Sequence, residues 1–196
     1  MKSAYIGISA AILAIAVLTS GCIFVYTEEK KTGDGSGDGT GFMELYVSDS
    51  PADIDDFDHL YVTFEKVRIS GYFDDDSQES WREESTSEMV DLTTLVGPRA
   101  ERILSLSLEE GDYTKIELYV ESTQGIVDGK ETDIFVPSGK LMINGGFRIE
   151  NNETVRFVFD INIVKRGNQD AYNLIPVIAK SGVVGEDLSE DEFEAV

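Results

Sequence analysis

Five aspartates crowd one short segment of the chain and are its best candidates for holding a metal ion. They are Asp49, Asp53, Asp55, Asp56 and Asp58. Ca²⁺ prefers carboxylate and carbonyl oxygens on an irregular loop. The segment therefore predicts a calcium site that stabilises the domain. The alternative is a loop that is acidic for solubility or for life in high salt, where screening weakens the repulsion between carboxylates.

Residue types for nucleophilic or redox catalysis are scarce. The chain has one histidine, His59, and one cysteine, Cys22. These counts exclude an internal disulfide, a CxxC redox pair and a zinc finger. His59 is out of phase with the apolar residues of its strand and is expected to face water, and the sequence has neither a GxSxG elbow nor a glycine-rich phosphate loop. We therefore assign no catalytic residue and expect a protein that is not an enzyme.

Paired carboxylates leave one enzymatic alternative open. Hydrolysis of a glycoside needs two acids at a defined separation across the bond that breaks. Acidic pairs are abundant here, including a second run at residues 74–76, so a hydrolase of surface glycans is the competing function. Tyr72, Phe73 and Trp81 flank that run. They either offer an aromatic sugar-binding face or pack across a hairpin.

The charge of the chain limits its partners. The 196 residues include 16 basic and 38 acidic side chains, a formal net charge of −22, with 41% hydrophobic residues. This apolar fraction is too high for a disordered acidic chain, and the length suits one folded domain. A field this negative repels phosphate backbones, so nucleic acid is excluded as a partner and cations are favoured.

The N-terminus has the pattern of an export signal. An apolar run at residues 4–18 follows Lys2, and small residues precede Cys22. The pattern resembles a lipoprotein signal, which makes residues 1–21 a signal peptide and Cys22 the lipidated first residue of the mature chain. The alternative is an uncleaved anchor, because the apolar stretch continues to Tyr26. Both interpretations place the rest outside the cytoplasm, at the cell surface and tied to a membrane.

Composition divides the exported part into three. Residues 22–41 are a glycine-rich, flexible tether, residues 42–182 form the folded domain, and residues 183–196 are an acidic tail that self-repulsion should keep loose. Asn152 opens an Asn-Glu-Thr sequon in an expected turn and is a candidate glycosylation site. The alternative for Asn152 is a plain polar turn.

From Phe42 onward the apolar residues alternate with polar ones, which is typical of strands. The longest regular stripe, at residues 155–163, predicts a central strand. The phase slips near Glu65-Lys66, which predicts a bulge. Pro176 places the last strand at an edge or at a bulge.

Turn residues complete the predicted fold. Asp128-Gly129 and Asn144-Gly145-Gly146 predict hairpins, because these residues tolerate positive φ. Residues 89–95 and 99–104 could each form a helical turn or two. With about eight strands at hairpin spacing, we predict an all-β fold, an antiparallel β-sandwich.

Short motifs occur in a fixed order along the folded part. They are Asp49-Ser50-Pro51, Val90-Asp91-Leu92, Gly111-Asp112-Tyr113, Pro137-Ser138-Gly139 and Leu174-Ile175-Pro176-Val177. This pattern resembles the family called domain of unknown function 4382, over residues 41–180. The resemblance implies a β-sandwich on exported, often lipid-anchored proteins of bacteria and archaea, with no established catalytic residues.

These observations predict a cell-surface lipoprotein with a binding or structural domain, stabilised by calcium if the aspartate loop holds the ion. The expected partners are the membrane, through the lipid anchor, and a surface protein or glycan. The alternatives are the glycan hydrolase and a subunit of a surface assembly that pairs through an exposed edge strand.

Overall fold

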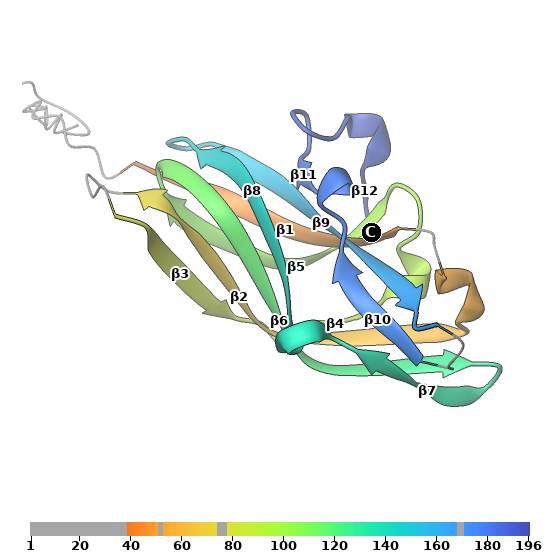
Figure 1. The fold of residues 1–196 in the computed structure, drawn as a ribbon. Helices are drawn as coiled ribbons and strands as arrows, with labels where there is room; N and C mark the ends of the chain where they lie inside the picture. The colour runs from red at the N-terminus through yellow and green to blue at the C-terminus, as the bar shows by residue number, and fades with distance from the viewer. Residues whose placement is uncertain (1–38, 51–52, 74–77, 168–170) are drawn as a thin grey trace, which may run out of the picture. The chain divides into compact units, whose positions relative to one another are not determined.

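The computed structural model describes residues 39–50, 53–73, 78–167 and 171–196, and these form an all-β fold (Figure 1). All twelve described strands belong to one mixed sheet, and only short 3₁₀ turns interrupt them. The strands are β1 (Thr40–Ser50), β2 (His59–Phe73), β3 (Ser80–Ser85), β4 (Met89–Asp91), β5 (Arg99–Glu109), β6 (Gly111–Val127), β7 (Lys130–Phe135), β8 (Lys140–Ile149), β9 (Thr154–Lys165), β10 (Ala171–Pro176), β11 (Gly182–Val183) and β12 (Glu194–Ala195). The predicted all-β class is confirmed.

The sheet order is β12-β5-β1-β9-β10-β7-β6-β2-β3, with β11 on β9, β4 on β2 and β8 on β6. Three pairs are parallel: β1 with β9, β7 with β10, and β5 with β12. The sequence predicted about eight strands, all antiparallel. Alternation along a strand shows which residues face a core, but it does not show the direction of the neighbouring strand.

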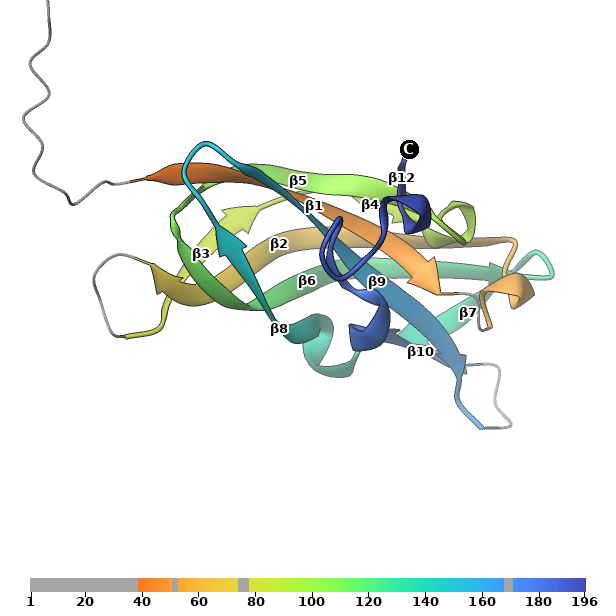
Figure 2. The ribbon, with the colours of Figure 1, turned by 90° about the horizontal axis from the view of Figure 1, so that it is seen from above.

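The apolar stripe of β9 lies near the middle of the sheet, as predicted. Phe157, Phe159 and Ile161 are almost fully buried, and β9 pairs with β1, β10 and β11. Their side chains share one apolar core with residues of β2 and β6, such as Val62 and Leu118. Figure 2 shows β1 and β9 crossing over β2 and β6.

The opposite face of β1 and β9 is covered as well. Tyr46 of β1 and Val158 of β9 belong to a second apolar cluster, together with Ala100 and Val184. Leu188 and Phe193 pack against this cluster. The central strands are therefore buried on both faces, and the outer cover comes from the C-terminal end of the chain.

Residues 183–196, which we expected to be a loose tail, are docked on the sheet. The ring of Phe193 meets Tyr46 edge to face, with centroids 4.9 Å apart, and the Arg156 guanidinium bonds Glu190. The Glu194 amide donates to the carbonyl of Pro98 at 2.6 Å. The prediction counted the repelling carboxylates but not the apolar side chains of the same segment, including Val184, Leu188 and Phe193, whose burial outweighs the repulsion.

Of the two hairpins predicted from turn residues, one is confirmed and one is wrong. Asp128 and Gly129 form the β6–β7 hairpin with φ of 50° and 70°, as predicted. Asn144-Gly145-Gly146 forms no hairpin, because β8 runs through these residues and a register shift against β6, between Tyr113 and Lys115, absorbs them. The bulge near Glu65 is confirmed by register shifts on both sides of Phe64.

Two further segments differ from the prediction. Residues 99–104 belong to strand β5 rather than to a helical turn, whereas residues 92–94 do form a 3₁₀ turn. Strand β10 lies between β9 and β7 and is not an edge strand. Pro176 is tolerated because β7 pairs only with residues 171–173, which leaves the last residues of β10 with a neighbour on one side.

No helix in the described ranges is long and apolar enough to cross a membrane. The predicted signal peptide, residues 1–21, and the predicted lipidation site Cys22 lie outside the residues that the structure describes.

Replacing Phe193 by alanine tests the docking of the C-terminal segment. The variant loses the ring packed on Tyr46, and we expect the free energy of unfolding to fall by about 1–3 kcal/mol. Urea unfolding followed by circular dichroism measures the change. The control is Glu194→Ala, whose exposed side chain should contribute less than about 0.5 kcal/mol. Equal stability of Phe193→Ala and wild type would mean that the segment is loose.

Candidate functional site

The aspartates of the predicted calcium loop do not converge on one point. Three of them hold the loop to other parts of the fold. Asp53 accepts from the Lys165 amide at 2.7 Å, Asp56 from the Tyr172 hydroxyl at 2.9 Å, and Asp58 from the Gly129 amide at 2.8 Å. Asp55 is exposed on the 3₁₀ turn between them.

No group of three or more His, Cys, Asp or Glu side chains in the described ranges is arranged to hold a metal ion. The loop carboxylates instead join the ends of β9 and β10 to the β6–β7 hairpin. Calcium binding by this loop stays a prediction.

Asp49, the first of the five aspartates, lies at the end of β1, before the loop that carries the other four. The residue is 1% exposed, and neither of its carboxyl oxygens has a hydrogen-bond partner among the described residues. Burial, together with the nearby charge of Asp160, raises the pKa of Asp49 to about 8, although Lys180 opposes the shift. Asp49 is therefore largely protonated at neutral pH.

A second buried acid, Asp160 in β9, was not predicted. It is 5% exposed, and its two carboxylate oxygens accept from Ser48 Oγ at 2.8 Å and from Ser50 Oγ at 2.6 Å. Burial raises the pKa of Asp160, while the two hydroxyl groups and Lys180 oppose the rise. The sequence signal was its position as the one acid inside the longest apolar stripe.

The parallel pairing of β1 and β9 builds this cluster. The register places Ser48 opposite Asp160 and Ser50 opposite Asn162. Because side chains alternate along a strand, Ser48 and Ser50 lie on the same face, one on each side of Asp160. We call Asp160, Ser48 and Ser50 the Asp160 cluster.

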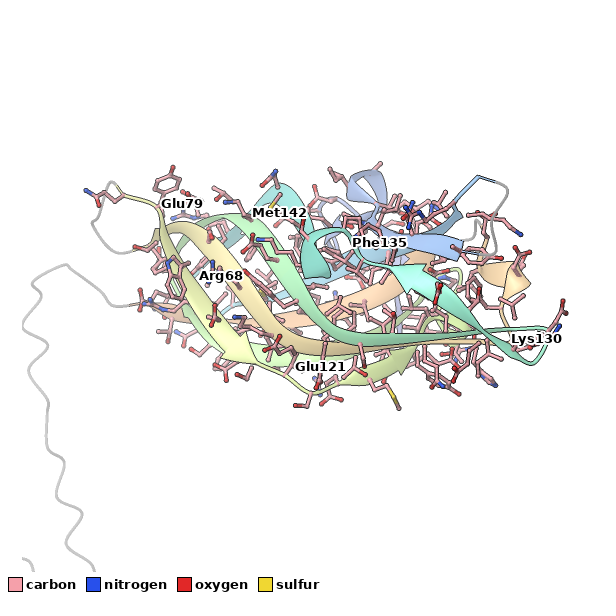
Figure 3. The ribbon with its side chains drawn as sticks, turned by 60° about the horizontal axis from the view of Figure 1, so that its bottom comes forward. Arg68, Glu79, Glu121, Lys130, Phe135 and Met142 are labelled. Carbon is pink, nitrogen blue, oxygen red and sulfur yellow. The ribbon has the colours of Figure 1, made fainter. Side chains whose placement is uncertain are left out.

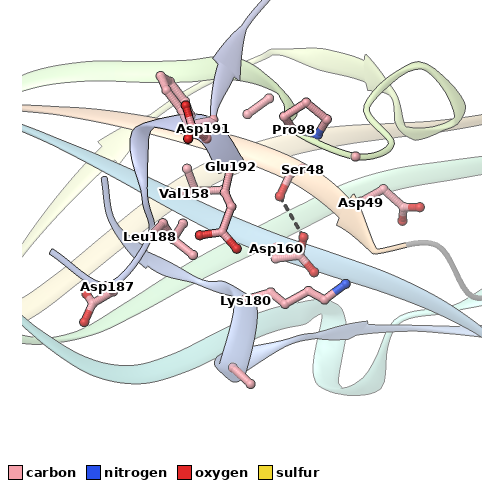
Figure 4. Close-up of a pocket in the computed structure, with 14 residues that line it drawn as sticks. Ser48, Asp49, Pro98, Val158, Asp160, Lys180, Asp187, Leu188, Asp191 and Glu192 are labelled. Atoms are coloured by element: carbon pink, nitrogen blue, oxygen red, sulfur yellow. Dashed lines mark hydrogen bonds between the residues drawn. The ribbon is translucent and has the colours of Figure 1, made fainter. Parts of the chain in front are cut away.

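The Asp160 cluster opens into a cavity of about 400 Å³. Apolar walls come from Ala100, Val158, Leu188 and Phe193, and charged groups stand around them. The charged residues are Asp49, Asp160, Lys180, Asp187, Asp191 and Glu192. Figure 4 shows Lys180 close to Asp160, with Asp49 and Asp187 at opposite ends. We call this space the Asp160 cavity.

His59 lies on the surface, as predicted. Its side chain is 51% exposed, its Nδ1 lies 2.7 Å from Asp91 Oδ2, and its ring stacks on Tyr61. Burial alone would raise the pKa of Asp91, but hydrogen bonds from Thr93 and His59, among others, hold it below its ordinary value. This pair stabilises the start of β2 and of the 3₁₀ turn at residues 92–94.

The three aromatic residues proposed as a sugar-binding face do not form one exposed surface. Phe73 is buried and stacks on Tyr113, with centroids 5.2 Å apart, whereas Tyr72 and Trp81 are about half exposed. The Arg68 guanidinium lies 4.7 Å from the centre of the Trp81 ring, on the open face of β2 (Figure 3). A role in binding glycans stays a prediction.

The predicted glycosylation residue, Asn152, is exposed in the turn between β8 and β9 with φ of 60°. The expected turn is confirmed, and modification of Asn152 stays a prediction.

The motifs noted in the sequence support local structure. Asp91 accepts from the amide of Thr93 and so caps the 3₁₀ turn. Gly111 allows two strands to approach closely, because a Cβ there would lie 2.6 Å from the carbonyl oxygen of Tyr72. The motif at residues 137–139 forms a turn in which Ser138 has a positive φ of 59°. Of the motifs, the one beginning at Asp49 reaches the cavity.

A family model described as domain of unknown function (DUF4382) matches residues 40–176, more than half of the chain. The chain belongs to the DUF4382 family. No curated protein and no solved structure matches it. Within this DUF4382 chain, the Asp160 cluster lies inside the matched residues. Lys180 and the C-terminal segment that closes the cavity lie beyond them.

Asp49→Asn tests the buried carboxyl group. The ordinary pKa is 3.8 and the folded pKa is about 8. Between about pH 4 and pH 8 the folded state therefore holds a proton that the unfolded state has lost, so this group makes stability fall as the pH rises through that window and level off above it. We expect the free energy of unfolding of Asp49→Asn to lack the part of this pH dependence that Asp49 contributes. Near pH 8 the variant should be more stable than wild type by several kcal/mol, at about 1.4 kcal/mol per pKa unit.

Urea unfolding across that pH range measures the difference between the two proteins. The matched control is Asp128→Asn, which neutralises an exposed carboxylate in a turn that asparagine tolerates. Its pH profile should follow that of wild type. Parallel profiles for Asp49→Asn and wild type would contradict the raised pKa.

Proposed function

We propose that the protein is a membrane-anchored, cell-surface lipoprotein whose domain binds a ligand in the Asp160 cavity. The observation that carries the proposal is a buried carboxylate, oriented by two hydroxyl groups, in a cavity of about 400 Å³. Ligand sites in proteins commonly have this volume and combine apolar walls with a few placed polar groups. The exposed rim residues Pro98 and Asp191 leave the cavity open to solvent.

Surface anchoring is the part of the proposal that rests on sequence. The apolar run at residues 4–18 and the small residues before Cys22 support export and lipidation. The glycine-rich residues between Cys22 and the start of β1 at Thr40 would then separate the domain from the membrane, and the net charge of −22 would keep it from lying on anionic lipids.

We also propose that the sheet is folded over as a β-sandwich. Support comes from the main core, in which buried residues of β1 and β9 pack with those of β2 and β6. Two halves of a twisted sheet that bury their apolar faces against each other form this architecture.

Hydrolysis of surface glycans is a second candidate function. It is favoured by the presence of a buried acid whose pKa is raised by burial, Asp160, and an exposed acid, Asp191, in the lining of one cavity. Glycoside hydrolysis uses one protonated and one ionised carboxyl group. Release of sugar from a glycan by wild type, and its loss in Asp160→Asn, would favour hydrolysis over binding.

The lipid anchor is tested by Cys22→Ser. In wild-type cells we expect the protein in the membrane fraction, with a mass that includes a lipid on Cys22, since two or more acyl chains give stable anchoring. The variant lacks the thiol and should lose the lipid mass. Fractionation and mass spectrometry of the intact protein measure both properties. An unmodified Cys22 in wild-type protein dissolved inside the cell would contradict the proposal.

Ligand binding is tested by blocking the cavity at its rim. Ala179 is exposed and lines the cavity, so Ala179→Trp should occlude it without removing a charge. The matched control is Ile178→Trp, at an exposed neighbour outside the lining. In a thermal-shift panel of amines, amino acids, sugars and metal salts, we expect a compound that raises the Tm of wild type and of the control but not of Ala179→Trp. If every compound that raises the Tm of wild type also raises the Tm of Ala179→Trp, binding in the cavity would be contradicted.

The calcium salt in the same panel tests the aspartate loop. Binding there should raise the Tm of all three proteins equally, because Asp53, Asp56 and Asp58 lie outside the cavity lining. If millimolar calcium leaves the Tm of all three proteins unchanged, calcium binding by the aspartate loop would be contradicted.

A further inference from the structure

We infer that the Asp160 cavity binds an organic cation, an ammonium or guanidinium group carried on an apolar stem. This inference rests on the proposed function, that the cavity binds a ligand, and adds the chemical class of that ligand. Its basis is the charge of the lining, the remaining hydrogen-bonding capacity of the buried Asp160 and the apolar walls beside it.

The charge of the lining is strongly one-sided. Five acidic residues and one basic residue belong to the lining. The acids are Asp49, Asp160, Asp187, Asp191 and Glu192, and the base is Lys180. Even with Asp49 and Asp160 protonated, three acidic residues remain against one lysine, so the field around the cavity attracts cations.

Asp160 has hydrogen-bonding capacity left for a ligand. Ser48 and Ser50 occupy one acceptor site on each of its oxygens, and a carboxylate has about four such sites. Asp160 is 5% exposed, so a ligand that donates to its free acceptor sites would do so in a place from which water is largely excluded.

The walls favour an organic cation over a metal ion. Within the described ranges, no three acidic, histidine or cysteine side chains are arranged to hold a metal. Val158, Leu188 and Phe193 instead line the space beside the carboxylates. An apolar stem can pack on these side chains while its charged end reaches Asp160, as lysine and arginine side chains do at protein surfaces.

Lys180 brings one ammonium group to this end of the cavity. Its charge acts on both Asp49 and Asp160, and Figure 4 shows its amino group close to Asp160. It lies at the exposed end of a 3₁₀ turn, so it can move aside when a ligand cation enters. Lys180 is thus a competitor for the ligand and not its anchor.

Isothermal titration of the full chain, purified in a non-ionic detergent, tests the inference with matched probes. Nα-acetyl-lysine methylamide and Nα-acetyl-arginine methylamide carry the cation, and Nα-acetyl-norleucine methylamide has the apolar stem alone. We expect at least tenfold tighter binding of one cationic probe than of the norleucine probe. Cadaverine, a free diamine, distinguishes the two sources of the cation: tighter binding of cadaverine indicates a free polyamine, and tighter binding of an acetylated probe indicates a side chain presented by a protein.

Variants test where the probe binds and which ligand charge the cavity prefers. Asp160→Asn should weaken the cationic probe at least tenfold, and Asp191→Asn, an exposed rim change that keeps the fold, about two- to fivefold. Lys180→Met removes the competing ammonium group and should tighten binding. Asp128→Asn, outside the cavity, is the matched charge control and should have no effect.

Three outcomes would overturn the inference. The first is equal binding of the norleucine and cationic probes, and the second is loss of binding in Lys180→Met, which would indicate an anionic ligand. The third is binding that neither Asp160→Asn nor Asp191→Asn weakens. If an uncharged compound raises the Tm of wild type but not of Ala179→Trp, the proposed function stands and the choice of a cation fails. If no probe binds and no panel compound depends on the cavity, both fail.

Discussion

Burial of β1 and β9 on both faces is the constraint on which the rest of the structure depends. Their inner residues form the main core, and Tyr46 and Val158 on the outer face pack with Leu188 and Phe193 from the C-terminal segment. Each large apolar side chain removed from water contributes about 1.5–3 kcal/mol. Without this cover the outer cluster would face solvent, and the Asp160 cavity would lose a wall.

The same two-sided burial makes the acids in these strands unusual. A carboxyl group in such a place keeps its charge only with hydrogen-bond donors or nearby cations. Asp160 has two hydroxyl donors, from Ser48 and Ser50, whereas Asp49 has none among the described residues and a pKa of about 8. Locally unfavourable groups of this kind are expected at functional sites, because elsewhere a sequence can replace them without loss.

The many other acids serve the fold in a different way. Asp53, Asp56 and Asp58 join a loop to distant strands through single hydrogen bonds, and Asp91 caps a turn. Such roles need no metal and use one carboxylate at a time. Clustering in the sequence therefore did not distinguish the acids that line a cavity from those that hold a loop, because acids close in sequence can have different partners in the fold.

Local patterns were sufficient to predict the all-β class, the central strand around Phe159, the Asp128-Gly129 hairpin and the surface position of His59, because each depends on alternation or turn chemistry within a few residues. The parallel pairing of β1 with β9, the docking of residues 183–196 and the meeting of Ser48 with Asp160 were decided by tertiary structure. Each joins segments far apart in the chain. Whether a polar residue faces water or a covering segment depends on which segment packs over it, and strand periodicity does not specify that segment.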